Sequence, residues 1–87
     1  MDNIKQVIEA RGNNYGRFKD HAHLSQELKG AMQRHTEYKY LSTEMRESLE
    51  MIQHKIARII NGNQNHLDSW VDIQGYAKLV SDGLEVI

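Results

Sequence analysis

Apolar residues in the second half of the chain recur at alternating spacings of four and three, the clearest pattern in the sequence. They are Met45, Leu49, Ile52, Ile56 and Ile59. This period places them on one side of an α-helix. Ser42 or Thr43 is a suitable N-cap for the helix, since a hydroxyl accepts a hydrogen bond from a free backbone N–H. Asn61-Gly62-Asn63 supplies the residues that commonly end a helix.

A second helix with the same period follows this turn. It is expected to begin near Leu67 or Asp68 and to end near Gly83. Its apolar positions are Trp70, Ile73, Ala77, Val80 and Leu84. Trp70 is therefore predicted to be a core or interface residue. The segment from Arg46 to Tyr76 is predicted to form a helical hairpin around which the rest of the chain is organised.

The first half of the chain predicts two further helices. The first is expected to bury an apolar stripe at Ile4, Val7 and Ile8 and to end at Gly12. Residues 12–19 are rich in turn formers and read as an ordered loop. A second helix is predicted from an N-cap at Asp20 to about His35. The expected fold is all-α: one domain, 1–87, forming a small bundle of about four helices.

Composition narrows the class of protein further. The 87 residues include no Cys and no Pro, and the formal net charge is -1. A chain this short without disulfides usually needs another source of buried area, so a homodimer or homotetramer is expected. Charges of both signs are mixed along the chain, which gives no basis for nucleic-acid binding. No apolar run approaches the roughly 20 residues of a membrane span, and the polar N-terminus does not resemble a secretory signal. We expect a cytoplasmic protein.

The two hairpin helices each carry acidic residues away from their apolar stripe. At about 100° per residue, Glu47 and Glu50 lie opposite the stripe of the first helix. Asp68 and Asp72 lie opposite that of the second, on the same side as Gly75 and Tyr76. A solvated surface is the simpler interpretation, because amphipathic helices normally carry charge on their outer face.

Two details favour a binding site over a solvated surface. Asp68 and Asp72 are like charges at i, i+4, an arrangement that destabilises a helix unless a cation or a partner intervenes. Gly75 on the same side would allow another group to approach the backbone closely. Four carboxylates converging between the helices would suit Mg²⁺, which prefers oxygen ligands. Lys55 and Arg58 would then hold phosphates that share the metal, and water would attack a phosphoanhydride.

These residues resemble the MazG-like, all-α nucleoside triphosphate pyrophosphatases, particularly the small phage and prophage members. The resemblance covers most of the chain. It is carried by Glu47-x-x-Glu50, by KIAR at 55–58, by DSWVDIQGYA at 68–77, and upstream by Arg11 and YGRF at 15–18. The resemblance implies dimers or tetramers that bind Mg²⁺ and hydrolyse a (d)NTP to the monophosphate and pyrophosphate.

Carried over by position, the resemblance makes Glu47, Glu50 and Asp72 catalytic metal ligands. Ser69 stands where the family has a Glu, and Asp68 lies one residue earlier as a further candidate ligand. The residues expected to bind substrate are Lys55, Arg58, Arg11, Tyr15 and Tyr76.

Several interpretations stay open at this point. Tyr15 and Phe18 would either stack on a nucleobase or cover the end of the bundle core, and the second is the simpler role. His54 is interpreted as a hydrogen-bond partner of Glu50 rather than as a base. The alternative interpretation of the whole chain is an inactive family member or a non-enzymatic, oligomeric interaction protein with acidic surfaces.

Overall fold

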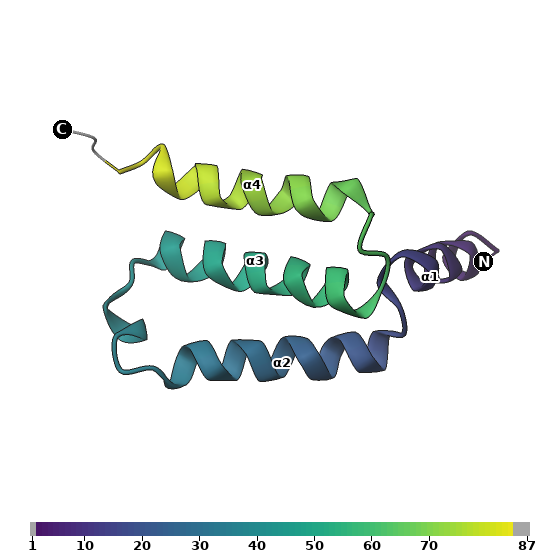
Figure 1. The fold of residues 1–87 in the computed structure, drawn as a ribbon, viewed down its shortest axis with the longest axis horizontal. Helices are drawn as coiled ribbons and strands as arrows, with labels where there is room; N and C mark the ends of the chain where they lie inside the picture. Colours follow the sequence, from purple (N-terminus) through teal and green to yellow (C-terminus); the bar gives the residue numbers. More distant parts are fainter. Residues whose placement is uncertain (1, 85–87) are drawn as a thin grey trace.

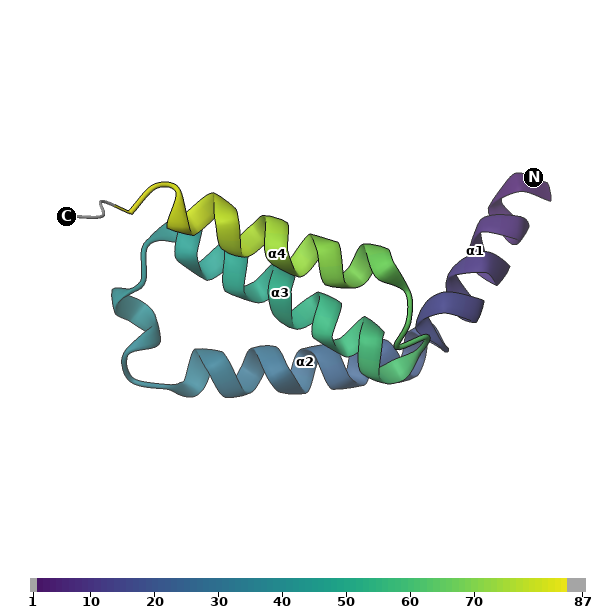
Figure 2. The same ribbon diagram turned by 45° about the horizontal axis from the view of Figure 1, so that its top comes forward.

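The computed structural model describes residues 2–84 and confirms the all-α prediction. Its elements are α1 (Asp2–Tyr15), α2 (Phe18–Arg34), the short 3-10 helix η1 (Tyr38–Tyr40), α3 (Thr43–Asn61) and α4 (Leu67–Ser81). Figure 1 shows α2, α3 and α4 side by side, with α3 in the middle of a three-helix layer. In Figure 2, α1 leaves this layer at one end and points away from it.

The predicted hairpin is present, with boundaries close to those expected. Ser42 is the N-cap of α3, and its side chain accepts a hydrogen bond of 3.1 Å from the backbone N–H of Met45. The helix ends at Asn61 as predicted, and five residues connect it to α4. The fourth helix ends at Ser81, two residues before the expected end.

The prediction for residues 12–19 is wrong. Gly12 lies inside α1, where a Gly costs only about 1 kcal/mol relative to Ala, and the helix continues to Tyr15. The chain turns at Gly16, whose φ of 76° is in the left-handed region that favours glycine. Helix α2 begins at Phe18 with Arg17 as its N-cap, so Asp20 lies in the first turn instead of capping it.

Close packing between α1 and the end of α3 explains why the turn falls at Gly16. A Cβ at Gly16 would collide with the backbone carbonyl of Asn61, and one at Gly62 would collide with the backbone of Tyr15. The side chain of Asn61 donates hydrogen bonds to the backbone carbonyls of Tyr15 (2.8 Å) and Arg17 (3.0 Å). These contacts fix the α1–α2 turn against the end of α3.

The layer has two unlike faces. Leu49 and Arg58 are nine residues apart on α3, so they point in opposite directions. On one side, Leu49 and Ile60 of α3 and Trp70 of α4 are exposed by 41%, 67% and 50%. We call this side the apolar face. It includes a groove of about 260 Å³ between α3 and α4, lined by Leu41, Met45, Ser48, Leu49, Ile52, Ala77 and Val80.

The opposite side, the polar face, carries Lys29, His54, Arg58 and Asp72. Side chains buried between the three helices are also mostly polar. They are His21, Ser25, Ser48, Gln53, Lys55 and Ser69, and Ala57 is the buried hydrophobic residue among those described. The apolar stripes predicted on α3 and α4 are therefore half-buried or exposed, since a single layer of helices has no second layer to cover them. The prediction of a buried stripe on α1 is wrong, because Ile4, Val7 and Ile8 are exposed where α1 points away from the layer (Figure 2).

Trp70 of α4 is half exposed, so it does not lie in a core of this chain. Its indole N–H donates a hydrogen bond of 2.8 Å to the backbone carbonyl of Gln64, while its neighbour Ser69 is buried against α3. A Cβ added at Gly75 would meet nothing within 4 Å, so no described residue makes the close approach expected there. None of the helices within residues 2–84 combines the length and apolar content needed to cross a membrane.

Candidate functional site

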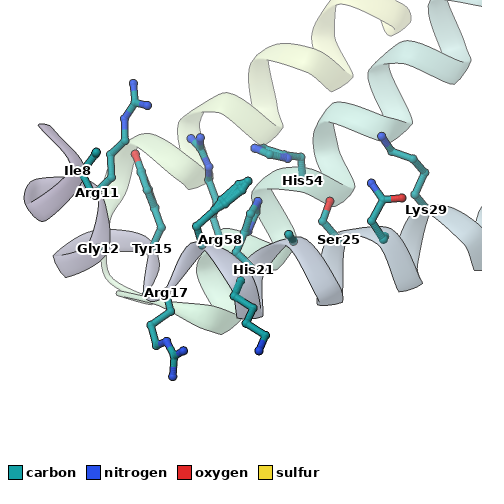
Figure 3. Close-up of a pocket in the computed structure, with 15 residues that line it drawn as sticks. Ile8, Arg11, Gly12, Tyr15, Arg17, His21, Ser25, Lys29, His54 and Arg58 are labelled. Atoms are coloured by element: carbon teal, nitrogen blue, oxygen red, sulfur yellow. The ribbon is translucent and has the colours of Figure 1, made fainter. Parts of the chain in front are cut away.

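A cavity of about 720 Å³ opens where α1, α2 and α3 meet (Figure 3). Its volume is in the range of pockets that bind small molecules and cofactors. It lies on the polar face, at the end of the layer where α1 crosses. Its lining residues are Ile8, Arg11, Gly12, Tyr15, Gly16, Arg17, Phe18, Lys19, His21, Ala22, Ser25, Gln26, Lys29, His54 and Arg58.

The lining contains five cationic side chains and no carboxylate. The cations are Arg11, Arg17, Lys19, Lys29 and Arg58. Lys29 lies 3.7 Å from Glu50, and Arg17 lies 4.0 Å from Asp20 on the exposed surface. For the other three, no carboxylate within residues 2–84 forms a salt bridge. A concave surface of one charge sign focuses its potential, so the cavity favours an anion.

Tyr15 and Arg58 form the centre of the cavity. The guanidinium of Arg58 lies 4.3 Å from the centroid of the Tyr15 ring, within the range of a cation–π contact. The Tyr15 hydroxyl and Nε2 of His66 share a hydrogen bond of 3.3 Å, and the two rings meet edge to face. The packing of Gly16 against Asn61 holds this group in place, because it fixes the end of α1 beside the last turn of α3.

Two histidines lie beside Arg58 in the cavity lining. The rings of His21 and His54 meet edge to face, with centroids 4.6 Å apart. His21 is 8% exposed, and neither of its ring nitrogens has a hydrogen-bond partner within residues 2–84. Burial, reinforced by the charge of Arg58, lowers the pKa of His21, and the same causes lower the pKa of His54 to about 4. Both rings are therefore neutral at pH 7.

The prediction that His54 pairs with Glu50 is wrong. Glu50 instead accepts a hydrogen bond of 2.5 Å from the Tyr38 hydroxyl and contacts Lys29 of α2. The bond to Glu50 raises the pKa of the Tyr38 hydroxyl. His54 lies one helical turn after Glu50 on α3, where its ring packs against His21 of α2.

The remaining candidate metal ligands lie apart from the cavity. Asp72 forms a salt bridge of 3.0 Å with Lys55, whose side chain is only 11% exposed. Lys55 thus supplies a positive charge that offsets the negative charge of Asp72. Glu47 and Asp68 are both exposed. Within residues 2–84, no three His, Cys, Asp or Glu side chains are grouped closely enough to hold a metal ion.

Helix geometry explains why the four carboxylates do not converge within one hairpin. Glu50 lies eleven residues before the end of α3, and Asp68 lies one residue after the start of α4. At 1.5 Å per residue, these positions are offset by about 15 Å along two antiparallel helices. The offset between Glu50 and Asp72 is about 9 Å by the same count. Within residues 2–84, these four carboxylates therefore do not form one oxygen-ligand set for Mg²⁺.

The structure brings together three of the five residues predicted to bind substrate. Arg11, Tyr15 and Arg58 share the cavity lining. Lys55 is engaged by Asp72. Tyr76 is half-buried on α4, where its backbone carbonyl accepts a hydrogen bond of 2.8 Å from Ser48.

Sequence reasoning did not assign Lys19, His21 and Lys29 to this site, although all three line the α2 side of the cavity. A signal was present, because Lys19, Ala22, Gln26 and Lys29 recur at three and four residues along one side of a helix. The expected role of Phe18 as a cover for the core is not met either. Its ring is 71% exposed at the rim of the cavity.

Comparison with known families gives one match. A family profile described as a domain of unknown function, DUF6378, matches residues 1–83. Comparisons with curated proteins and with solved structures return no match. Because the profile spans nearly the whole chain, including the cavity and the hairpin, the chain belongs to the DUF6378 family.

Proposed function

We propose that this protein is a MazG-like nucleoside triphosphate pyrophosphohydrolase that holds the polyphosphate of a (d)NTP in the cationic cavity. The reaction is hydrolysis of the (d)NTP to the monophosphate and pyrophosphate in the presence of Mg²⁺. The observation that carries the proposal is the cavity lining, with five cations and no carboxylate.

The charge of the cavity is local, because the chain as a whole has a formal net charge of -1. Cations from α1, α2 and α3 are concentrated at one place on a nearly neutral protein. Arginines suit this task, since the planar guanidinium forms paired hydrogen bonds with phosphate oxygens. Tyr15 and the exposed ring of Phe18 at the rim would offer aromatic surfaces to a nucleobase.

The proposed catalytic carboxylates are Glu47, Glu50 and Asp72, with Asp68 as a further metal ligand. Asp72 and Glu50 lie along the same polar face as the cavity, but the chain alone does not group them around one ion. The residues of this chain that act on substrate in the proposal are the cavity cations, which bind and neutralise the polyphosphate.

A second copy of the chain is part of the proposal, as a homodimer or homotetramer in the cytoplasm. Leu49, Ile60 and Trp70 are exposed on the face opposite the cavity. Surfaces of this kind mark association sites in small proteins. Pairing two layers through their apolar faces would leave both cavities accessible.

The test is an assay of pyrophosphate release from a panel of NTPs and dNTPs, with Mg²⁺ and with EDTA. We expect turnover that requires Mg²⁺ and that is lost in Arg58→Gln. Arg34→Gln is the matched control, because it removes one positive charge from an exposed position of α2 outside the cavity lining. Absence of turnover with every nucleotide, together with no thermal shift on nucleotide addition, would rule the proposal out.

The apolar face also supports a second candidate, a non-enzymatic helical interaction protein. In that case the apolar face is the functional surface. A protein that assembles through this face yet neither binds nor hydrolyses nucleotides would favour this candidate. Light scattering of Ile60→Asp, which places a charge on the apolar face, measures the assembly independently of any nucleotide.

A further inference from the structure

We infer that His21 and His54 form a subsite for a phosphoryl group, in which each imidazole donates a hydrogen bond to the ligand and gains a proton as the ligand binds. This inference rests on the proposed function, since it assigns part of the same cavity. It adds two residues that neither the sequence motifs nor the family match assigns.

The first support is an unsatisfied polar group in a buried position. His21 is more than nine-tenths buried, lines the cavity, and has no partner for either ring nitrogen. Leaving a buried polar group without a hydrogen bond is costly, so such a group is an exception that needs an explanation. A ligand in the cavity would supply the missing partner.

The second support is the arrangement around His21. The ring of His54 lies edge to face with it, at 4.6 Å between centroids, and Arg58 acts on both rings. Figure 3 shows the three side chains together in the cavity lining, with Ser25 and Lys29 farther along α2. Two imidazoles and a guanidinium from adjacent helices suit a compact, multiply charged oxyanion.

The surrounding charge explains the coupling to protons. The cations whose charge acts on the pair are Lys29 of α2 and Lys55 and Arg58 of α3, and Arg11, Arg17 and Lys19 also line the cavity. Glu50 extends toward this group but is engaged by Lys29 and Tyr38. Without an anion, these cations and burial keep both rings neutral. An anion in the cavity reverses the sign of the local potential and favours the imidazolium forms.

The same surroundings disfavour a metal ion as the ligand. Two neutral imidazoles are suitable ligands for a transition metal, but the adjacent lining contributes positive charge and no carboxylate. A divalent cation would be repelled by Arg58 and Lys29. The chemistry that fits the subsite is therefore a tetrahedral oxyanion, such as a phosphoryl group of a nucleotide or free phosphate.

The experiment follows the histidine ring nitrogens by NMR in the full chain, with EDTA and without Mg²⁺. The titrants are inorganic phosphate, pyrophosphate, a deoxynucleoside triphosphate, and sulfate, whose charge is constant between pH 5 and 8. We expect the ring signals of His21 and His54 to move saturably toward imidazolium values at pH 6. His23 and His35, which are exposed on α2 and beyond its end, serve as internal controls.

Affinity for sulfate is expected to rise about fivefold or more between pH 8 and pH 6, with net proton uptake in calorimetry. His54→Gln should remove most of this pH dependence, and the matched control His23→Gln should retain it. Unchanged signals from His21 and His54 at saturating ligand would overturn the inference, as would equal movement of the control rings. The wild-type titration decides the question even if a variant fails to fold.

Failure of this inference is distinguishable from failure of the proposed function. Anion binding at the histidines without Mg²⁺-dependent turnover would remove the hydrolase and keep the subsite. Turnover with unaffected histidine rings would keep the hydrolase and overturn the subsite.

Discussion

The cationic cavity and the acidic side of the α3–α4 hairpin share one face of the molecule, yet their charges are organised differently. The cavity collects charges from α1, α2 and α3, at positions that range in sequence from Arg11 to Arg58. The carboxylates lie on two helices adjacent in sequence, but they remain apart or are neutralised by Lys29 and Lys55. Spatial grouping therefore depends on where helices cross, and spacing within one helix does not determine it.

The largest expected effect is on the free energy of unfolding, and it tests the packing of Gly16 against Asn61 at the end of the cavity. Gly16→Ala should lower the free energy of unfolding by about 3 kcal/mol, because a left-handed Ala is strained and its Cβ collides with Asn61. Gly12→Ala is the matched control. It lies within α1 with open space at the Cβ, so it should be neutral or stabilising by up to about 1 kcal/mol. Chemical denaturation measures both, and equal effects would contradict the description of the α1–α3 junction.

The next largest expected effect is on ligand affinity, and it distinguishes binding in the cavity from binding at the hairpin. Arg58→Gln should weaken binding of a nucleoside triphosphate about 10- to 100-fold, the loss expected for a charge-assisted hydrogen bond. Arg34→Gln should change affinity by less than about twofold. Calorimetry without Mg²⁺ measures these values. Wild-type affinity in Arg58→Gln would place the ligand elsewhere.

A smaller effect concerns the hairpin. Asp72→Asn should destabilise the protein by about 1–2 kcal/mol, because it leaves the largely buried Lys55 without its partner. If relief of repulsion between Asp68 and Asp72 were the larger effect, Asp72→Asn would instead stabilise the protein. Thermal and chemical unfolding of Asp72→Asn and of Asp68→Asn decide between the two, and a stabilised Asp72→Asn would show that the salt bridge does not dominate.

The smallest effect is a pH dependence of stability. The pKa of His54 is about 4 in the fold and about 6.5 in an unfolded chain. Between these values the unfolded chain binds more protons, so stability is fully present above pH 6.5 and falls as the pH drops toward 4. The lowered pKa of His21 acts in the same direction. Melting temperatures of wild type and His54→Gln from pH 8 to 4 should differ in slope, and parallel curves would contradict the assignment.

The sequence predicted the helices well, because helix periodicity and capping are local properties. The Ser42 cap, the end of α3 at Asn61 and the paired stripes on α3 and α4 are observed. The position of the first turn was wrong, since Gly16 is selected by a distant contact with Asn61. No pattern near residue 16 reports on residue 61.

The candidate site was predictable only in part. Arg11, Tyr15 and Arg58 were identified, although their proximity depends on how α1 crosses the end of α3. The separation of Glu50 from Asp68 follows from helix rise and was available from the sequence, given antiparallel helices. The contact of His54 with His21 was not available from the sequence, because it depends on how α2 is positioned along α3.

The most direct test of the account is a map of backbone NMR shifts on titration with a deoxynucleoside triphosphate. We expect the largest changes at the cavity, around Tyr15, His21 and Arg58, with small changes at Asp68. Changes centred on Glu47, Asp68 and Asp72, with the cavity unaffected, would contradict the central claim that the cationic cavity holds the polyphosphate.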